Sequence, residues 1–581
     1  MHTFRNAGSS LLFVLLASTF GIADDRTAAD LLPATTVIYA EIPQPAALLD
    51  VLENHLLRKR IENLEGVQAA YEGKQFLQLK AAVAIIEAKL GQKWPQILQS
   101  VSEGGISLGF DARSQGVMLL IKARDEEAAP KLLETLIELA RAGATGDGKP
   151  DPVSSGEYRG ITAYQVNQAR IATLGTWLLV TNKPESGKAL LDAYLDKPEN
   201  TLASNLQFQE ARSKVADSAT AWGYIDIDTV RKGGIAKTLF SGKTENAVAE
   251  LLVGGLLDTL QHTPYATASL TLDPQRTRLE LAAPHQQQWT TEAREYFFGP
   301  NGSGRAPALI EVENQLAAIS TYRDVSTMWL RAGDLFDDKV VDQLAQADSN
   351  LSTLFAGKDF GEEILGEVHP EIQVVVARQL FADKTPKPAI KLPAFAAVFR
   401  LKDPETVGPD FRRTYQSLIG FLNVIGAMNG QPQLDLDMDK EDNYQIVSAN
   451  YLPEKDASPG GLKIHYNFSP SVAFVGEHFI VSSTKALARE LAVAVSKENK
   501  PNSDVNSFVQ VNVGGVSAIL ADNRGQLVAQ NMLSEGHSKE EAERAIGDLF
   551  ALLEAVEDAS IDLAASEGTL RASLEIDYVA D

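Results

Sequence analysis

The chain has 581 residues, a formal net charge of −24 and no cysteine. A chain of this length can bury enough apolar surface without disulfides, and the lack of cysteine excludes both disulfides and a lipid anchor on an N-terminal cysteine. The negative charge is spread along the whole chain, which disfavours binding to the phosphate backbone of nucleic acids.

The N-terminus has the pattern of a secretory signal peptide. Arg5 precedes an apolar run at residues 11–20, and Gly21 and Ala23 place small side chains where a signal peptidase reads. The run is short for a membrane span, and no later segment is apolar over the length that a bilayer needs. We therefore predict a signal peptide at residues 1–23 and an exported protein, periplasmic or secreted. A retained N-terminal anchor is the alternative.

Two parts of the chain repeat the same elements in the same order. A predicted strand at 117–124 is followed by a predicted helix at 131–142, and the pattern recurs as a strand at 395–402 and a helix at 411–428. Self-similarity of this kind indicates an internal duplication.

Further blocks extend the repeat along most of the chain. The matched blocks are 97–98 with 364–365, 106–110 with 372–376, 175–180 with 476–481, 186–190 with 483–487, 222–227 with 508–513, and 246–281 with 543–576. The opening strand and helix at 36–57 have only a loose counterpart, at 325–338. We predict a first repeat at 24–298, a Gly- and Pro-rich linker at 299–308 and a second repeat at 309–581.

The predicted fold class is α+β. The strands alternate apolar and polar residues, with Phe395, Ala397 and Phe399 on one face, as half-buried antiparallel strands do. The helices carry one apolar stripe, which includes Leu132 and Leu136. Because strands come in pairs between helices, we expect each half to be an antiparallel sheet with helices packed mainly on one face.

The start of the predicted mature chain carries a family resemblance. Residues 31–39 (LLPATTVIY), followed by a helix and by the hairpin and helix blocks, resemble a family of exported bacterial proteins of unknown function. The resemblance implies an extracytoplasmic location. It brings no catalytic residues.

Two serine motifs could suggest catalysis. Ser107 lies in a G-x-S-x-G pattern, but the predicted strand continues past it, whereas a nucleophile elbow needs a helix there. Ser482 and Lys485 form S-x-x-K at a strand-to-helix junction, without the further motifs of penicillin-recognising enzymes. Since Ser and Thr are expected at a helix N-terminus, we interpret the second motif as a cap.

An acidic stretch at 435–442 is the only suggestion of a metal site. Asp435, Asp437 and Asp439 alternate with apolar residues, which predicts a strand with three carboxylates on one wet face. The spacing fails as a calcium-binding loop, because Lys440 stands where a glycine is needed. Whether this stretch binds calcium stays open.

The histidines form no metal-binding spacing, although His465 and His478 are predicted on neighbouring strands and could approach each other. No phosphate loop or dinucleotide fingerprint is present. The sequence therefore assigns no catalytic, cofactor-binding or metal-binding residue.

Three functions remain open. The first is a non-catalytic exported binding or structural protein whose ligand or protein partner is unknown. The second is a carrier of an apolar or lipid-like ligand held between sheet and helices, for which Tyr39, Trp177, Phe395 and Phe399 could line a groove. The third is a hydrolase whose site is assembled from distant residues.

Overall fold

The computed structural model describes residues 26–146, 150–234, 237–240, 242–381, 387–441, 443–451, 462–497, 503–566 and 568–579. The predicted signal peptide at residues 1–23 lies outside this range and stays a prediction. Within the described part of the chain, no helix is both long and apolar enough to span a bilayer.

The strands of the N-terminal half are β1 (Thr36–Ile42), β2 (Ile106–Asp111), β3 (Gly116–Lys122), β4 (Val153–Tyr158), β5 (Ile161–Val166), β6 (Ala169–Leu174), β7 (Trp177–Thr181), β8 (Ala221–Asp226), β9 (Tyr265–Leu272) and β10 (Arg276–Pro284). Its helices are α1 (Pro45–Asn54), α2 (Leu57–Glu62), α3 (Glu65–Glu72), α4 (Lys74–Leu90), α5 (Trp94–Ser102), α6 (Ala128–Gly146), α7 (Pro184–Asp196), α8 (Leu206–Lys214), α9 (Ile227–Lys232), α10 (Ala247–His262) and α11 (Glu295–Phe298).

The strands of the C-terminal half are β11 (Gln315–Tyr322), β12 (Glu371–Ala377), β13 (Ala394–Arg400), β14 (Leu434–Lys440), β15 (Gln445–Tyr451), β16 (Ser471–Val475), β17 (His478–Ser482), β18 (Ser507–Asn512), β19 (Val556–Ser566) and β20 (Thr569–Tyr578). Its helices are α12 (Val325–Leu330), α13 (Ala332–Leu335), α14 (Asp338–Leu354), the π-helical turn η7 (Phe360–Ile364), α15 (Pro404–Met428), α16 (Lys485–Val495), α17 (Val513–Asp522), α18 (Arg524–Glu535) and α19 (Lys539–Leu553).

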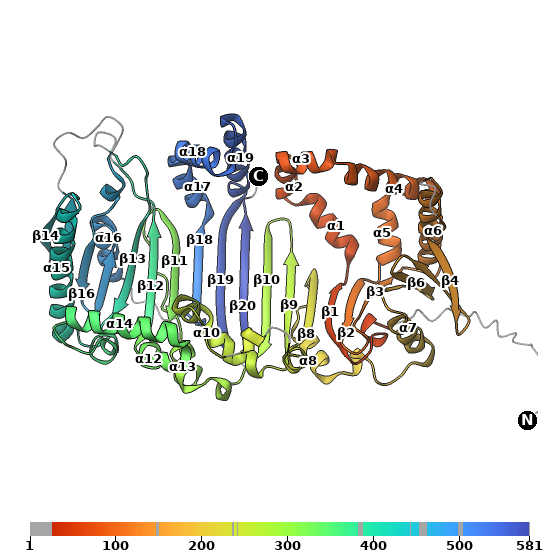
Figure 1. Ribbon diagram of the computed structural model, residues 1–581, viewed down its shortest axis with the longest axis horizontal. Helices are drawn as coiled ribbons and strands as arrows, with labels where there is room; N and C mark the ends of the chain where they lie inside the picture. Colours follow the sequence, from red (N-terminus) through yellow and green to blue (C-terminus); the bar gives the residue numbers. More distant parts are fainter. Residues whose placement is uncertain are drawn as a thin grey trace, which may run out of the picture.

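All strands of the described residues join one twenty-stranded antiparallel sheet. The first half has the order β4-β5-β6-β7-β3-β2-β1-β8-β9-β10. The second half has the order β14-β15-β16-β17-β13-β12-β11-β18-β19-β20. Each strand of the first half therefore has a counterpart in the same place of the second. Figure 1 shows the sheet crossing the molecule, with β10 and β20 near its middle. The expected α+β class is confirmed.

The two halves meet at the antiparallel pair of β10 and β20. In the first half the residue row Trp222–Ser269–Glu280 crosses β8, β9 and β10. In the second half the corresponding row Phe508–Asp562–Ser573 crosses β18, β19 and β20. Glu280 pairs directly with Ser573, so the two rows meet end to end. An interface in which corresponding residues face each other is that of a twofold-symmetric dimer.

Two of the predicted matches between the halves need correction. The counterpart of β1 is β11, whereas the matched stretch 325–338 is helical over α12 and α13. The match of 186–190 with 483–487 is wrong by about one helical turn. Lys183 and Thr484 both directly precede their helices, so Lys188 of α7 corresponds to Arg489 of α16 and not to Lys485.

Helices cover both faces of the outer strands, whereas helices packed mainly on one face were expected. Leu178 of β7 packs in a core with Leu133 and Ile137 of α6. Its neighbour Leu179 packs in another core with Leu190 of α7. Since successive strand residues point to opposite faces, α6 and α7 lie on opposite sides of the sheet.

The predicted linker at 299–308 is part of the packed seam between the halves. After the short 3-10 turn Pro300–Gly302, the chain runs without helix or strand to β11. Ala306 is fully buried, and its backbone N–H donates to the carbonyl of Val505. A third core also lies across the seam, with Phe297 from the first half and Phe336 from the second. The two halves therefore share a core as well as a sheet.

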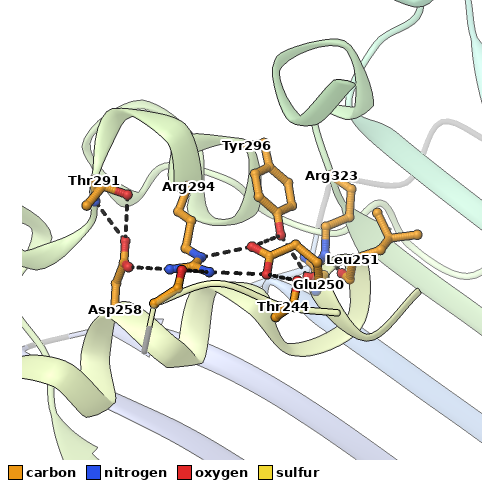
Figure 2. Close-up of polar contacts among 9 residues, drawn as sticks. Thr244, Glu250, Leu251, Asp258, Thr291, Arg294, Tyr296 and Arg323 are labelled. Carbon is orange, nitrogen blue, oxygen red and sulfur yellow. Dashed lines mark hydrogen bonds and ion pairs between the residues drawn. The ribbon is translucent and has the colours of Figure 1, made fainter. Parts of the chain in front are cut away.

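A buried ionic cluster holds the segment after α10 against that helix. Arg294, 3% exposed, donates from Nε to Glu250 Oε1 at 2.8 Å and from Nη1 to Asp258 Oδ1 at 2.7 Å. Thr291 donates to Asp258 and Tyr296 to Glu250 (Figure 2). Burial disfavours the charge of Arg294, but its hydrogen bonds to the two carboxylates keep the pKa of the guanidinium above its ordinary value.

We expect Arg294→Leu to lower the free energy of unfolding by about 3–5 kcal/mol, because Glu250 and Asp258 would remain buried without their cation. The measurement is urea unfolding of the mature chain. Arg331→Ala is the control, since the ion pair of Arg331 with Asp334 is solvent-exposed and its loss should cost less than about 1 kcal/mol. Equal effects of the two substitutions would contradict the assignment.

Candidate functional site

Arg323 is a buried cation at the end of β11. Its side chain is 3% exposed, and its guanidinium donates to neutral acceptors: Nε to the carbonyl of Leu251 at 2.6 Å and Nη1 to Asn506 Oδ1 at 2.8 Å. The guanidinium carbon lies 3.5 Å from the ring centre of Phe297. Figure 2 shows Arg323 beyond Tyr296, on the side away from Arg294.

Arg323 differs from Arg294 in its charge balance. Among the described residues, no carboxylate forms an ion pair with Arg323, whereas Arg294 has two. Burial lowers the pKa of the Arg323 guanidinium to about 9, which leaves it charged at neutral pH. An isolated buried charge costs several kcal/mol, and the contact with Phe297 offsets only part of this. The side chain is therefore a cation that lacks an anion.

Beside Arg323 lies an apolar chamber of about 250 Å³. The sheet supplies one wall, through Ile372 of β12, Phe399 of β13 and Phe479 of β17. The opposite wall comes from α12, α15 and the π-helical turn, and includes Phe360 and Phe411. π-Helical turns are rare and often occur at functional sites. The volume is just below the range of about 300–1,000 Å³ that is usual for ligand pockets.

The polar groups of the chamber are few. Arg323 and His369 are the titratable residues in its lining, and the other lining residues are aliphatic or aromatic. Such a space favours a ligand with an apolar body, and the positive charge of the guanidinium favours a carboxylate. Nε and Nη1 already donate to Leu251, Tyr322 and Asn506, so a ligand carboxylate would accept from Nη2.

The serines of the two motifs form hydrogen bonds within the fold. Ser107 is 4% exposed in the middle of β2, with its hydroxyl 3.3 Å from that of Tyr39. The hydroxyl of Ser482 donates to the carbonyl of Thr484, and the side chain of Thr484 accepts from the N–H of Leu487 to cap α16. The interpretation of the second motif as a cap is confirmed.

The histidines and the aromatic candidates are dispersed. His465 lies in a short 3-10 helix against the ring of Tyr451, whereas His478 begins β17 opposite Arg400. Within the described residues, no three His or acidic side chains are arranged to hold a metal ion.

Of the four aromatic residues suggested for a groove, Phe399 lines the chamber. Tyr39 and Trp177 are buried in the core of the first half, and Phe395 is 52% exposed on the surface. No sequence pattern identifies Arg323 as a candidate functional residue. Its importance depends on the lack of an acidic partner in space, and the chain has 77 acidic residues from which a partner could have come.

Comparisons with known proteins add little. No known protein family and no curated protein matches the chain. Similar solved structures include crystal form III of TP0453, which is 14% identical, covers 45% of this chain and 80% of its own, and has a TM-score of 0.23. Crystal form I of TP0453 is 15% identical, with 45% and 78% coverage and a TM-score of 0.24. These values carry no argument about function.

The acidic stretch forms β14 as predicted, but two of its carboxylates are already paired. Asp437 and Asp439 bind Lys485 of α16 at 2.7 and 3.0 Å, and Asp439 also binds Arg489. Asp442 lies outside the described residues. Two cations beside these carboxylates oppose a further cation.

We therefore expect calcium to leave the melting temperature of the mature chain unchanged, and a chelator to have no effect either. The measurement is thermal unfolding with added calcium or with a chelator. A calcium-dependent rise that Asp439→Asn removes would restore the calcium hypothesis.

Proposed function

We propose that the protein is a non-catalytic, exported binding protein whose chamber beside Arg323 carries a small molecule with an apolar body and a carboxylate. The single observation that supports this is that the buried guanidinium of Arg323, which has no carboxylate partner among the described residues, lies beside an apolar chamber. A bound carboxylate would neutralise Arg323, and the apolar body would fill the space between sheet and helices. This joins the first two functions left open by the sequence.

A structural role for Arg323 is the second candidate. The guanidinium contacts the carbonyl of Leu251 in the first half and Asn506 in the second, so it also ties the halves together. In that case the chamber would be an empty cavity in the core. Substitution of Arg323 would then change the free energy of unfolding but not the amount of bound ligand.

Export is part of the proposal and rests on the signal pattern at residues 1–23 and on the family resemblance of residues 31–39. The absence of cysteine is compatible with an oxidising compartment, since no free thiol would need protection there.

We also propose that the two halves arose by duplication. The identical strand order supports it, and so does the register. Leu120 of β3 pairs with Leu179 of β7, and Val398 and Ile480, which the sequence match places in the same positions, pair with each other. Pairs of this kind recur from strand to strand, which two unrelated halves would not produce.

The test of the binding function is native mass spectrometry of the mature chain, beginning at Asp24 and purified from the compartment to which it is exported. We expect a bound mass that leaves on denaturation. Arg323→Met should remove one equivalent of that mass, because the methionine keeps the apolar contacts and loses the charge.

Arg231→Met is the control, since Arg231 also donates to backbone carbonyls, but it pairs with Asp228 and does not line the chamber. It should keep the full bound mass. A clean apo mass for the wild-type chain, or an unchanged bound mass in Arg323→Met, would refute the proposed chamber ligand.

A further inference from the structure

A groove at the opposite end of the sheet has features of a second site. It lies between strands β4–β7 and helix α7, and has a volume of about 270 Å³. Its floor is apolar and includes Ala163, Ala172, Leu179 and Leu190. Lys188 of α7 belongs to its lining.

The hairpin that forms one wall is fastened to α7. Arg159 and Gly160 form its two-residue turn, and both have positive φ, which suits the tight hairpin turns of right-twisted strands. Arg159 binds Asp192 at 2.7 Å and Asp196 at 2.6 Å, near the C-terminal end of α7. Asp192 also accepts from the hydroxyl of Tyr158 at 3.1 Å, and the ammonium of Lys188 lies 5.4 Å from the centre of that ring without an ion pair to Asp192.

In the second half, the corresponding strands carry larger side chains at two of the positions that line the groove in the first half. The row Gly156–Ala163–Ala172–Leu179 crosses β4 to β7, and the row Asp439–Ile446–Ala473–Ile480 crosses β14 to β17 in the same way. Ile446 is fully buried, and Asp439 binds Arg489, which corresponds to Lys188.

The first half thus keeps the cation and lacks the groups that accompany it. Gly156 stands in place of Asp439, and Ala163 in place of Ile446. Among the described residues, Lys188 forms no ion pair, whereas Arg489 does. The groove of the first half therefore lies where the second half places the carboxylate of Asp439 and the side chain of Ile446.

A second cation strengthens the site. Arg170 of β6 lines the groove where the second half has Ser471, and it donates to the backbone carbonyls of Gln168 and, at 3.3 Å, of Asn182. Glu157 is the acidic residue in the lining. It alternates with Gly156 along β4, which directs its side chain to the other face of the strand.

We propose that this groove is a second ligand site, independent of the chamber beside Arg323, which takes a small organic carboxylate with an apolar body. The ligand carboxylate replaces that of Asp439 and pairs with Lys188, and the apolar body replaces the side chain of Ile446. Arg170 adds positive charge at the rim. In the second half these positions hold Asp439 and Ile446. In the first half they hold Gly156 and Ala163, which leave room for a ligand.

The test is calorimetric titration of the mature chain carrying Arg323→Met, which removes the cation of the chamber. Octanoate should bind one equivalent, and neutral octanamide about tenfold more weakly, since charge-assisted pairing is worth about this much. Lys188→Met should weaken octanoate about tenfold and leave octanamide unchanged. Arg489→Met, the same change in the filled site, should alter neither.

Two further variants distinguish the contribution of the ligand's charge from that of the volume of the groove. Gly156→Asp supplies an internal carboxylate and should abolish octanoate binding, and a Cβ at Gly156 meets no atom within 4 Å, so the strand accepts it. Ala163→Ile fills the floor and should exclude both probes.

Equal affinity for octanoate and octanamide, no effect of Lys188→Met, or no binding in an Arg323→Met chain that still unfolds cooperatively would each overturn the second site. The chamber is tested separately by octanoate binding to Gly156→Asp with Arg323 intact, because that variant should not bind octanoate in the groove. Failure of one site is thereby distinguished from failure of the other.

Discussion

The antiparallel pairing of β10 with β20 is the constraint on which the architecture depends. It converts the open edges of two sheets into one continuous ladder, and thereby removes two edges that would otherwise offer unpaired N–H and C=O groups to other chains. Because Glu280 faces Ser573, its own counterpart, the pairing fixes the halves in a twofold relation. The shared core around Phe297 and Phe336 and the buried cluster around Arg294 then close the seam.

The same relation shows how one strand arrangement can carry different side chains. Corresponding strands keep their order and register, but side chains at corresponding positions differ in volume and charge. Where the second half has Asp439 and Ile446, the outer helix packs on a filled and neutralised surface. Where the first half has Gly156 and Ala163, the same framework encloses a groove. Backbone hydrogen bonding tolerates these exchanges because it does not depend on side-chain size.

Much of the fold could be predicted from the sequence, because alternation with period two identifies strands such as 117–124 and 395–402. The expected apolar face of the second strand was wrong, since Ala396 and Val398 are buried whereas Phe395 is 52% exposed. The match of Lys188 with Lys485 was wrong because similar residues recur one helical turn before the true counterpart, Arg489. The positions at which the two helices begin, after Lys183 and after Thr484, decide the match. The lack of an acidic partner for Arg323 among the described residues could not be predicted, since it depends on which side chains lie beside it in three dimensions.

Overall charge and local charge have different consequences in this protein. The chain carries 53 basic and 77 acidic residues, so its long-range field repels anions. That field is screened over about 8–10 Å at physiological ionic strength, whereas an ion pair inside a pocket acts at contact distance and is screened far less. Arg294 and Arg489 both have a carboxylate partner in this acidic chain. A cation without one, placed beside apolar space, is therefore more informative about binding than the net charge.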